Sequence, residues 1–434
     1  MESILLRNKL KSTAKSFLRE VFGSGNEYEQ KAREMLFLAI LTQGTTILSH
    51  LAKDEGAQND YCDETQEKPQ KRRSIRKGIQ ERMSRWLSKR DFRAQEYLLS
   101  NGTRFVHDDV TIAFDQSDIS KEFGGKGMEG MAKGHDGSRN VTAMGHDVIG
   151  ASVVPMGRGV AIPLLVKLLK GRTGAPEQTR SLIDQIFLAT GGLGQLALDR
   201  GYDSDALLCF LSERNYKAVV RVQHMKRDVF GDGLEISEAF QKEAGWDAKL
   251  VRAKGMQNAR LKYKLGNFPH EDKKSKTTSY FPVMLVSSFF DGKEIFLYVV
   301  RKSFEGLTPE DLKRLAQQAA QAYFDRWGIE TFFLRVKQDY HIEDARVRTF
   351  RRLANLLSLC VLAYLFTSQY LRTQTEEYKF VMKAMKDSFH KVAAGVQSFV
   401  INLREMLHCE QIAYISGRPR KSVARDKRQL LLPF

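Results

Sequence analysis

The chain has 434 residues, of which 42% are apolar, so it is long enough for two or three domains, each with a buried core. Its 69 Lys and Arg outnumber 52 Asp and Glu, and a formal net charge of +17 favours a polyanionic partner, most often nucleic acid, over a merely basic protein. The sequence has no secretory signal, no apolar run of membrane-spanning length and no CxxC pair among its four cysteines. We therefore expect a soluble cytoplasmic protein without a membrane span, a disulfide framework or a zinc knuckle.

Residues 1–107 have a helical pattern. Between residues 32 and 51, apolar residues recur at helical spacing and are interrupted by Gln-Gly-Thr-Thr at 43–46, as in a helix-turn-helix or a plain helical hairpin. After a polar linker at about 54–70, residues 71–90 hold nine cations against one acid, Glu81. A solvated helix face could have this composition, but so uneven a ratio favours contact with phosphates. We predict a helical DNA-binding domain at 1–107, with these candidate phosphate contacts: Arg72, Arg73, Arg76 and Lys77.

Residues 108–222 alternate between strand and helix patterns, which predicts an α/β block. The expected strands lie at 110–114, 141–154, 159–166, 195–198 and 218–222, and the expected helices at 176–188 and 204–214. Residues 223–305 break this alternation. Stretches 249–265 and 280–301 are strand-like, and Asp291-Gly292 within the second is typical of a hairpin turn, so we predict an all-β insertion.

Helices resume near Pro309 and continue to the end of the chain. The apolar stretch 353–366 is too short for a membrane span and is flanked by arginines, so we expect a buried helix. Residues 373–434 end in a second basic cluster and are predicted to form a C-terminal helical basic region.

Two aspartates follow predicted strands. Asp115 ends the strand beginning at 110, and Asp199 ends the strand 195–198. Functional sites of α/β sheets form at this edge, although a lone aspartate there can also cap a helix or begin a turn. Two aspartates that each follow a predicted strand favour one shared site. Asp118 is the alternative for the first position.

A helix after the insertion carries the most informative spacing. Tyr323, Arg326, Glu330 and Lys337 are separated by 3, 4 and 7 residues. At the helical period they fall within a sector of roughly 60°, whereas apolar side chains on another sector can face the core. An ordinary i, i+4 ion pair would explain Arg326 and Glu330. It would not explain why Tyr323 and Lys337 share the face.

Together these residues suit phosphodiester chemistry. Asp115, Asp199 and Glu330 could ligate two Mg²⁺ or Mn²⁺ ions, because these hard cations prefer carboxylate oxygen. Paired ions about 3.5–4 Å apart activate an attacking oxygen and stabilise the leaving one. Cations beside them would bind DNA phosphates. The expected DNA contacts here are Tyr323, Arg326, Lys337 and Arg200.

The motifs resemble those of bacterial insertion-sequence transposases of the DDE class, in the subgroup with a Tyr-x2-Arg-x3-Glu-x6-Lys signature. Residues 114–118 and 198–202 resemble the family's first and second acid motifs, and the likeness covers about residues 108–370. It implies a ribonuclease-H-like mixed α/β fold whose two parts, at 108–222 and 306–372, are interrupted by the β insertion at 223–305. It also implies metal-dependent cleavage at transposon ends and transfer of the 3′ hydroxyl into target DNA. A homodimer bound to terminal inverted repeats would perform these steps in the bacterial cytoplasm, at the nucleoid.

Two other functions fit the same residues: a domesticated transposase that only binds DNA as a regulator, and a metal-dependent nuclease without strand transfer. In some relatives an insertion tryptophan stacks on a flipped base. Here Trp246 and the nearby Phe304 are expected to be core residues. The GxGxxG match at 125–130 is expected to be a loop, since no strand precedes it. His135, His146 and His341 have no metal-ligand spacing and are expected to be structural.

Overall fold

The computed structural model describes residues 2–52, 69–90, 92–121, 127–136, 141–155, 160–170, 176–241, 248–250, 259–272, 277–290, 293–370 and 379. The predicted C-terminal basic region, 373–434, lies outside these residues except for position 379. The helices are α1 (Glu2–Phe22), α2 (Glu27–Gln43), α4 (Pro69–Leu87), α5 (Ala94–Thr103), α6 (Pro176–Thr190), η2 (Arg200–Tyr202), α7 (Asp205–Glu213), α8 (Ile236–Gln241), α9 (Pro309–Asp325), α10 (Trp327–Gln338), η3 (Ile342–Asp344), α11 (Phe350–Leu365) and η4 (Phe366–Tyr370). The strands are β1 (Thr111–Ser120), β2 (Ala132–Asp136), β3 (Val141–Val154), β4 (Ile162–Leu168), β5 (Gln195–Leu198), β6 (Ala218–Arg221), β7 (Ala248–Leu250), β8 (Ala259–Asp272), β9 (Thr277–Phe290) and β10 (Lys293–Val300).

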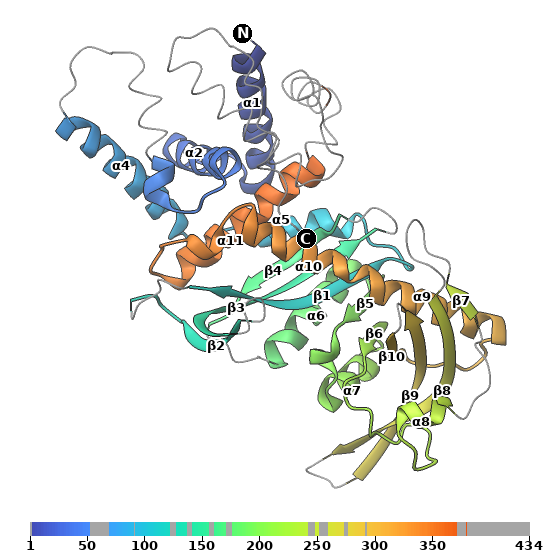
Figure 1. Cartoon of the computed structure of the whole chain (residues 1–434). Helices are drawn as coiled ribbons and strands as arrows, with labels where there is room; N and C mark the ends of the chain where they lie inside the picture. The colour runs from blue at the N-terminus through green and yellow to red at the C-terminus, as the bar shows by residue number, and fades with distance from the viewer. Residues whose placement is uncertain are drawn as a thin grey trace, which may run out of the picture.

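One mixed sheet organises the molecule. Its strand order is β2-β3-β1-β5-β6-β10-β9-β8-β7, with β4 paired to β3 (Figure 1). β1, β5 and β6 are parallel neighbours, whereas β3 and β10 run antiparallel on either side of them. This is the predicted ribonuclease-H-like α/β arrangement with helical flanks. The helices and strands expected between residues 141 and 222 are confirmed, with shifts of a few residues at their ends.

The first strand is longer than predicted. β1 pairs with β3 along its whole length, from Thr111 opposite Val154 to Ser120 opposite Gly145, while its pairing with β5 stops at Phe114. Asp115 therefore lies in the middle of a strand, and the prediction that it ends one is wrong. The polar residues after it stay extended because β3 supplies their backbone hydrogen bonds.

The insertion continues the same sheet. β10 pairs with β6, so β8, β9 and β10 extend the sheet beyond β6, and the short helix α8 lies within the segment predicted to be all-β. The predicted hairpin is confirmed by the pairing of Phe290 with Lys293. The two turn residues between them lie outside the described residues.

The N-terminal helices pack on the sheet domain through one continuous apolar core. The ring of Phe366, at the end of α11, lies 5.3 Å from Phe17 of α1 and 5.7 Å from Phe37 of α2, centroid to centroid. The break predicted within 32–51 is present: α2 ends at Gln43, Gly44 adopts a left-handed φ of 62°, and residues 48–52 are helical again. Residues 53–68 lie outside the described residues.

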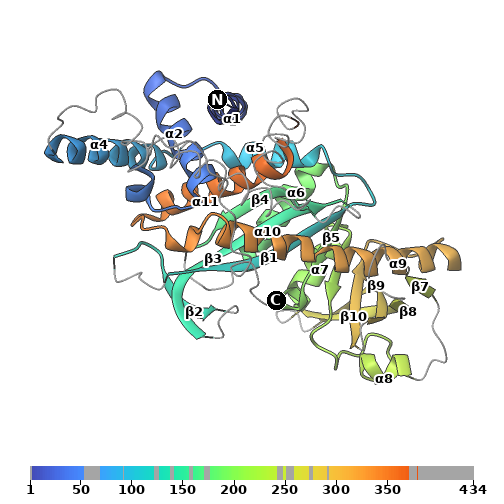
Figure 2. The same ribbon diagram turned by 45° about the horizontal axis from the view of Figure 1, so that its top comes forward.

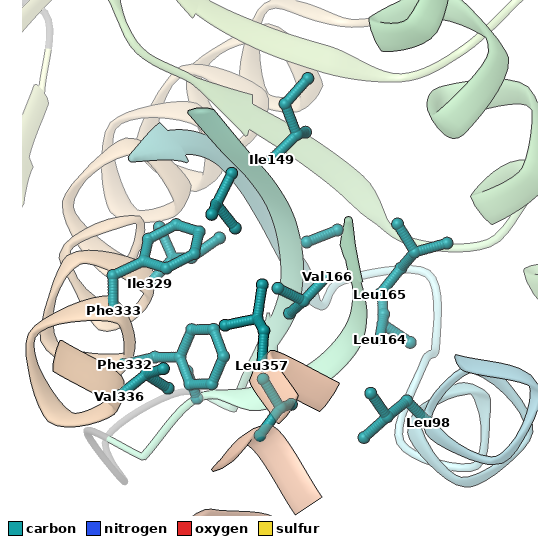
Figure 3. Close-up of a cluster of buried hydrophobic side chains, with 14 of the residues drawn as sticks. Leu98, Ile149, Leu164, Leu165, Val166, Ile329, Phe332, Phe333, Val336 and Leu357 are labelled. Carbon is teal, nitrogen blue, oxygen red and sulfur yellow. The ribbon is translucent and has the colours of Figure 1, made fainter. Parts of the chain in front are cut away.

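α9 and α10 cross one face of the sheet, from β3 to β8 (Figure 2). The apolar side of α10 faces inward, where Ile329, Phe332 and Phe333 pack with strand residues and with Leu357 of α11 (Figure 3). Gly150 of β3 permits this approach, because a Cβ there would lie 2.7 Å from the Phe333 ring. Phe350–Tyr370 is long and apolar enough to span a membrane, but 83% of its most apolar window is buried inside the protein. The buried helix predicted at 353–366 is thus confirmed.

Candidate active site

The predicted helix face begins at the junction of two consecutive helices. α9 ends at Asp325 and α10 begins at Trp327, with Arg326 between them at φ −50° and ψ −31°. These angles are helical, so the chain continues in the same direction. The structure divides the predicted single helix at Arg326, and the hydrogen bonds below show that the four motif residues still point to the same side.

The two aspartates are brought together by the register of the parallel strands β1 and β5. Phe114 of β1 pairs with Leu198, the last residue of β5. Asp115 continues β1 and Asp199 directly follows β5, so the two residues lie at the same level of the sheet, where the pairing of these strands stops. Side chains at this edge lie outside the core of the sheet and can face a common site.

Arg326 joins three acids. Its Nη1 donates to Asp115 Oδ2 at 3.0 Å, and its Nη2 donates to Glu330 Oε1 at 2.6 Å. The same Nη2 lies 4.0 Å from Asp199 Oδ1. The Arg326 side chain is only 4% exposed, against 16% for Asp115, 31% for Asp199 and 36% for Glu330. The structure thus brings the three predicted acids to one guanidinium, which lies beneath them.

Tyr323 and Arg221 hold Asp199 from the other side. The Tyr323 hydroxyl donates to Asp199 Oδ1 at 3.0 Å and accepts a hydrogen bond from Arg221 Nη1 at 3.2 Å. Arg221 Nη1 also lies 3.8 Å from Asp199 Oδ1. The sequence interpretation missed Arg221. It ends β6, the parallel neighbour of β5, but the strand predicted at 218–222 ran past it, so the sequence placed Arg221 inside a strand.

Lys337, near the end of α10, binds a separate pair of acids. Its Nζ donates to Asp118 Oδ1 at 2.8 Å and lies 3.8 Å from Glu343 Oε1. Asp118 also accepts a hydrogen bond from the Ser120 hydroxyl at 2.6 Å. Asp115, and not its alternative Asp118, is the acid joined through Arg326 to Glu330.

The charges at the site perturb one another. Burial raises the pKa of Asp115 to about 6, with Glu330 and Asp199 adding to the rise and Arg326 opposing it. Burial alone would lower the pKa of Arg326, but the three carboxylates together raise it. Burial also raises the pKa of Tyr323, with the nearby Asp199 carboxylate as a second cause. The carboxylates are therefore close enough to repel, and the guanidinium is the charge that balances them.

The donor set fits a divalent cation. Three carboxylates from β1, the end of β5 and α10 supply the hard oxygen ligands that Mg²⁺ and Mn²⁺ prefer. Within the described ranges, no group of three or more His, Cys, Asp or Glu side chains is close enough to share an ion as the site stands. Positive charge at its centre comes from Arg326 instead.

The other predicted DNA contacts lie around this centre and on α4. Arg200 is exposed in η2, directly after Asp199. α4 buries Ile79, Met83 and Trp86. On the same helix Lys77 is exposed and Arg76 is half-buried, whereas the side chains of Arg72 and Arg73 lie outside the described residues.

The residues to which the sequence analysis assigned no chemistry have the following positions in the structure. Phe304 is 8% exposed and belongs to the core, as predicted, and Trp246 lies outside the described residues. His146 is buried with its ring against Phe350, and His341 accepts a hydrogen bond from Thr46 through its backbone carbonyl. The side chain of His135 and residues 125–126 of the GxGxxG stretch lie outside the described part.

Comparison with known proteins identifies the family. The family described as "Transposase DDE domain" matches residues 107–366, which is more than half of the chain and contains every acid of the site. A search of curated proteins finds no match. The matched range begins just before β1 and ends at Phe366, directly after α11, so it contains the sheet and the helices that position the acids. The chain therefore belongs to the family of transposases with a DDE domain.

Proposed function

We propose that this protein is a DNA transposase that cuts at transposon ends and joins the freed 3′ hydroxyl to target DNA. The observation that carries the proposal is the meeting of Asp115, Asp199 and Glu330 at Arg326. Asp115 and Asp199 are 84 positions apart, and Asp199 and Glu330 are 131 apart, which an incidental surface ion pair would not require.

The three acids would hold two Mg²⁺ or Mn²⁺ ions. Bound there, the ions would activate the attacking oxygen and stabilise the leaving one. Tyr323 and Arg221 orient Asp199, and the Asp115 carboxylate accepts hydrogen bonds from the Gln116 backbone N–H and from Arg326 Nη1.

The surrounding cations suit a DNA backbone. Arg200 and Arg221 are accessible beside Asp199, and Lys337 lies near Asp118 on the same side of the sheet. We infer that these side chains, with Tyr323 and Arg326, contact phosphates next to the cut bond, as their Tyr-x2-Arg-x3-Glu-x6-Lys spacing supports. α4 would bind DNA further away. The assembly would be a homodimer on terminal inverted repeats in the bacterial cytoplasm, at the nucleoid.

Joining of a pre-cut end to a plasmid tests the proposal. Purified protein with Mg²⁺ is incubated with labelled DNA carrying the repeats that flank its gene, and with a supercoiled plasmid. We expect labelled end covalently joined to plasmid. Shortened products without joining would indicate a nuclease, and binding without any cutting would indicate a DNA-binding regulator.

A further inference from the structure

The position of Arg326 is unusual for a residue expected to contact DNA. Its guanidinium is buried below the acids, and its Nε has no hydrogen-bond partner. A buried charged donor without a partner is destabilising, so the position needs a compensating interaction. That interaction is the set of carboxylates at Nη1 and Nη2.

The guanidinium also sets the spacing of the acids. Asp115 and Glu330 bind different nitrogens of one guanidinium, which therefore lies between their carboxylates. A Mg²⁺ ion requires its oxygen ligands at about 2.0–2.1 Å, so ligands of a shared ion must approach much more closely than ligands of a guanidinium. An ion and the guanidinium cannot occupy this space together.

Exposure shows the direction from which an ion arrives. The side chains of Asp199 and Glu330 are 31% and 36% exposed, whereas that of Arg326 is 4% exposed. An ion from solvent meets the carboxylates first and the guanidinium behind them. Arg326 can then give up its two carboxylate partners without closing the entrance.

We propose that Arg326 is a built-in counter-cation that occupies the divalent-metal site of the DNA-free protein and competes with the metal for Asp115 and Glu330. The inference rests on the proposed function, because it requires that the acids bind metal. Once displaced, the guanidinium becomes available to a phosphate. Metal binding and phosphate binding are thereby linked, and each favours the other.

Binding of Mn²⁺ to the full-length, DNA-free protein tests the inference. Free Mn²⁺ is followed by its electron paramagnetic resonance signal at constant pH in wild type and Arg326→Gln. Loss of the competing charge is expected to tighten Mn²⁺ binding about tenfold or more, within the range of about 5- to 150-fold typical of coupled sites. Equal affinities in the two proteins would overturn the inference.

Arg221→Gln is the matched control. It removes the same charge at a residue that lies 3.8 Å from Asp199 but does not separate two acids. Its effect should be about twofold, the scale of a partly exposed ion pair. A change as large as that of Arg326→Gln would mean that general electrostatics, and not occupation of the site, governs affinity, and would also overturn the inference.

Two further variants keep the test decisive. Arg326→Lys retains the charge but has one ammonium in place of a fork, and should tighten binding by an intermediate factor if Arg326→Gln fails to fold. Asp115→Asn should remove the Mn²⁺ site in wild type and in Arg326→Gln. If Asp115→Asn leaves Mn²⁺ binding unchanged, the acids hold no ion and the proposed function fails as well. If it removes the site while Arg326→Gln matches wild type, only the role of Arg326 fails.

Discussion

Tyr323 donates a hydrogen bond to Asp199 at 3.0 Å, and so links the first motif residue of α9 to the acid at the end of β5. The contact crosses 124 residues of sequence. It fixes the side chain of Asp199 while leaving the outer part of the carboxylate exposed.

Tyr323→Phe should therefore disturb the position of Asp199, and with it DNA cleavage, more than it lowers the stability of the fold. We expect a loss of about 1 kcal/mol in the free energy of unfolding, the typical net worth of one hydrogen bond, and a larger proportional fall in DNA cleavage. Urea unfolding and a nicking assay measure the two effects. Tyr280→Phe is the control, since Tyr280 is 67% exposed on β9. Full cleavage activity in Tyr323→Phe would show that its hydroxyl does not position the acid.

Glu330→Gln should abolish cutting and leave DNA binding nearly intact. The amide keeps the size of the side chain but lacks the charge that a divalent ion requires. Cleavage and gel-shift assays on the same DNA separate the two properties. Glu310→Gln, at an 82% exposed side chain in the first turn of α9, provides the control and should cut normally. Parallel loss of cutting and binding in Glu330→Gln would identify the glutamate as structural.

Asp115 should make the metal-free protein less stable as pH rises. Its pKa is about 6 in the folded protein, above the value of 3.8 for the free side chain. The folded state therefore holds the proton more tightly, and this stabilisation is complete below pH 4 and is lost as pH rises through 6. A shift of this size corresponds to about 3 kcal/mol.

The measurement is the difference in unfolding free energy between wild type and Asp115→Asn in chelator at several pH values. The comparison cancels the other titrating groups. Wild type should lose stability relative to the variant between pH 4 and 6, and the difference should then level off. A pH-independent difference would contradict the raised pKa.

DNA binding should weaken steeply with salt. Each phosphate contact contributes about 0.9 to the slope of log K against log salt. Arg76→Gln combined with Lys77→Gln should reduce the slope by about 2 and weaken binding to all sequences alike. Lys293→Gln, an exposed cation at the start of β10, is the control and should leave the slope unchanged. A slope that the double variant does not alter would remove α4 from the DNA interface.

Gly150→Ala should destabilise the sheet–helix contact. The new Cβ would lie 2.7 Å from the Phe333 ring, and overpacking of this kind costs about 1–3 kcal/mol. Gly78→Ala in α4 meets no atom within 4 Å and should instead stabilise by about 0.5–1 kcal/mol, because alanine favours a helix interior over glycine. Denaturant unfolding measures both changes. Equal changes in the free energy of unfolding at the two glycines would mean that the Phe333 ring moves away from the new Cβ without loss of stability.

Much of the architecture is readable from local patterns. β3, β5, β6, α6 and α7 follow from apolar periodicity and from turn residues, which depend on near neighbours in the chain. β1 does not, because the segment after Asp115 is polar and is extended only through its pairing with β3. Residues that take their conformation from a distant strand leave no local pattern to read.

The sequence alone, through residue types and spacing, determined which acids and most of the cations were candidates for the site. Which of them touch was decided by the tertiary structure. Spacing predicted that Arg326 and Lys337 face DNA, whereas folding pairs Arg326 with Asp115 and Glu330, pairs Lys337 with Asp118, and adds Arg221 to the site. The reason is physical: helix period places side chains on a face, but only the packing of that face on the sheet selects the carboxylate that each cation meets.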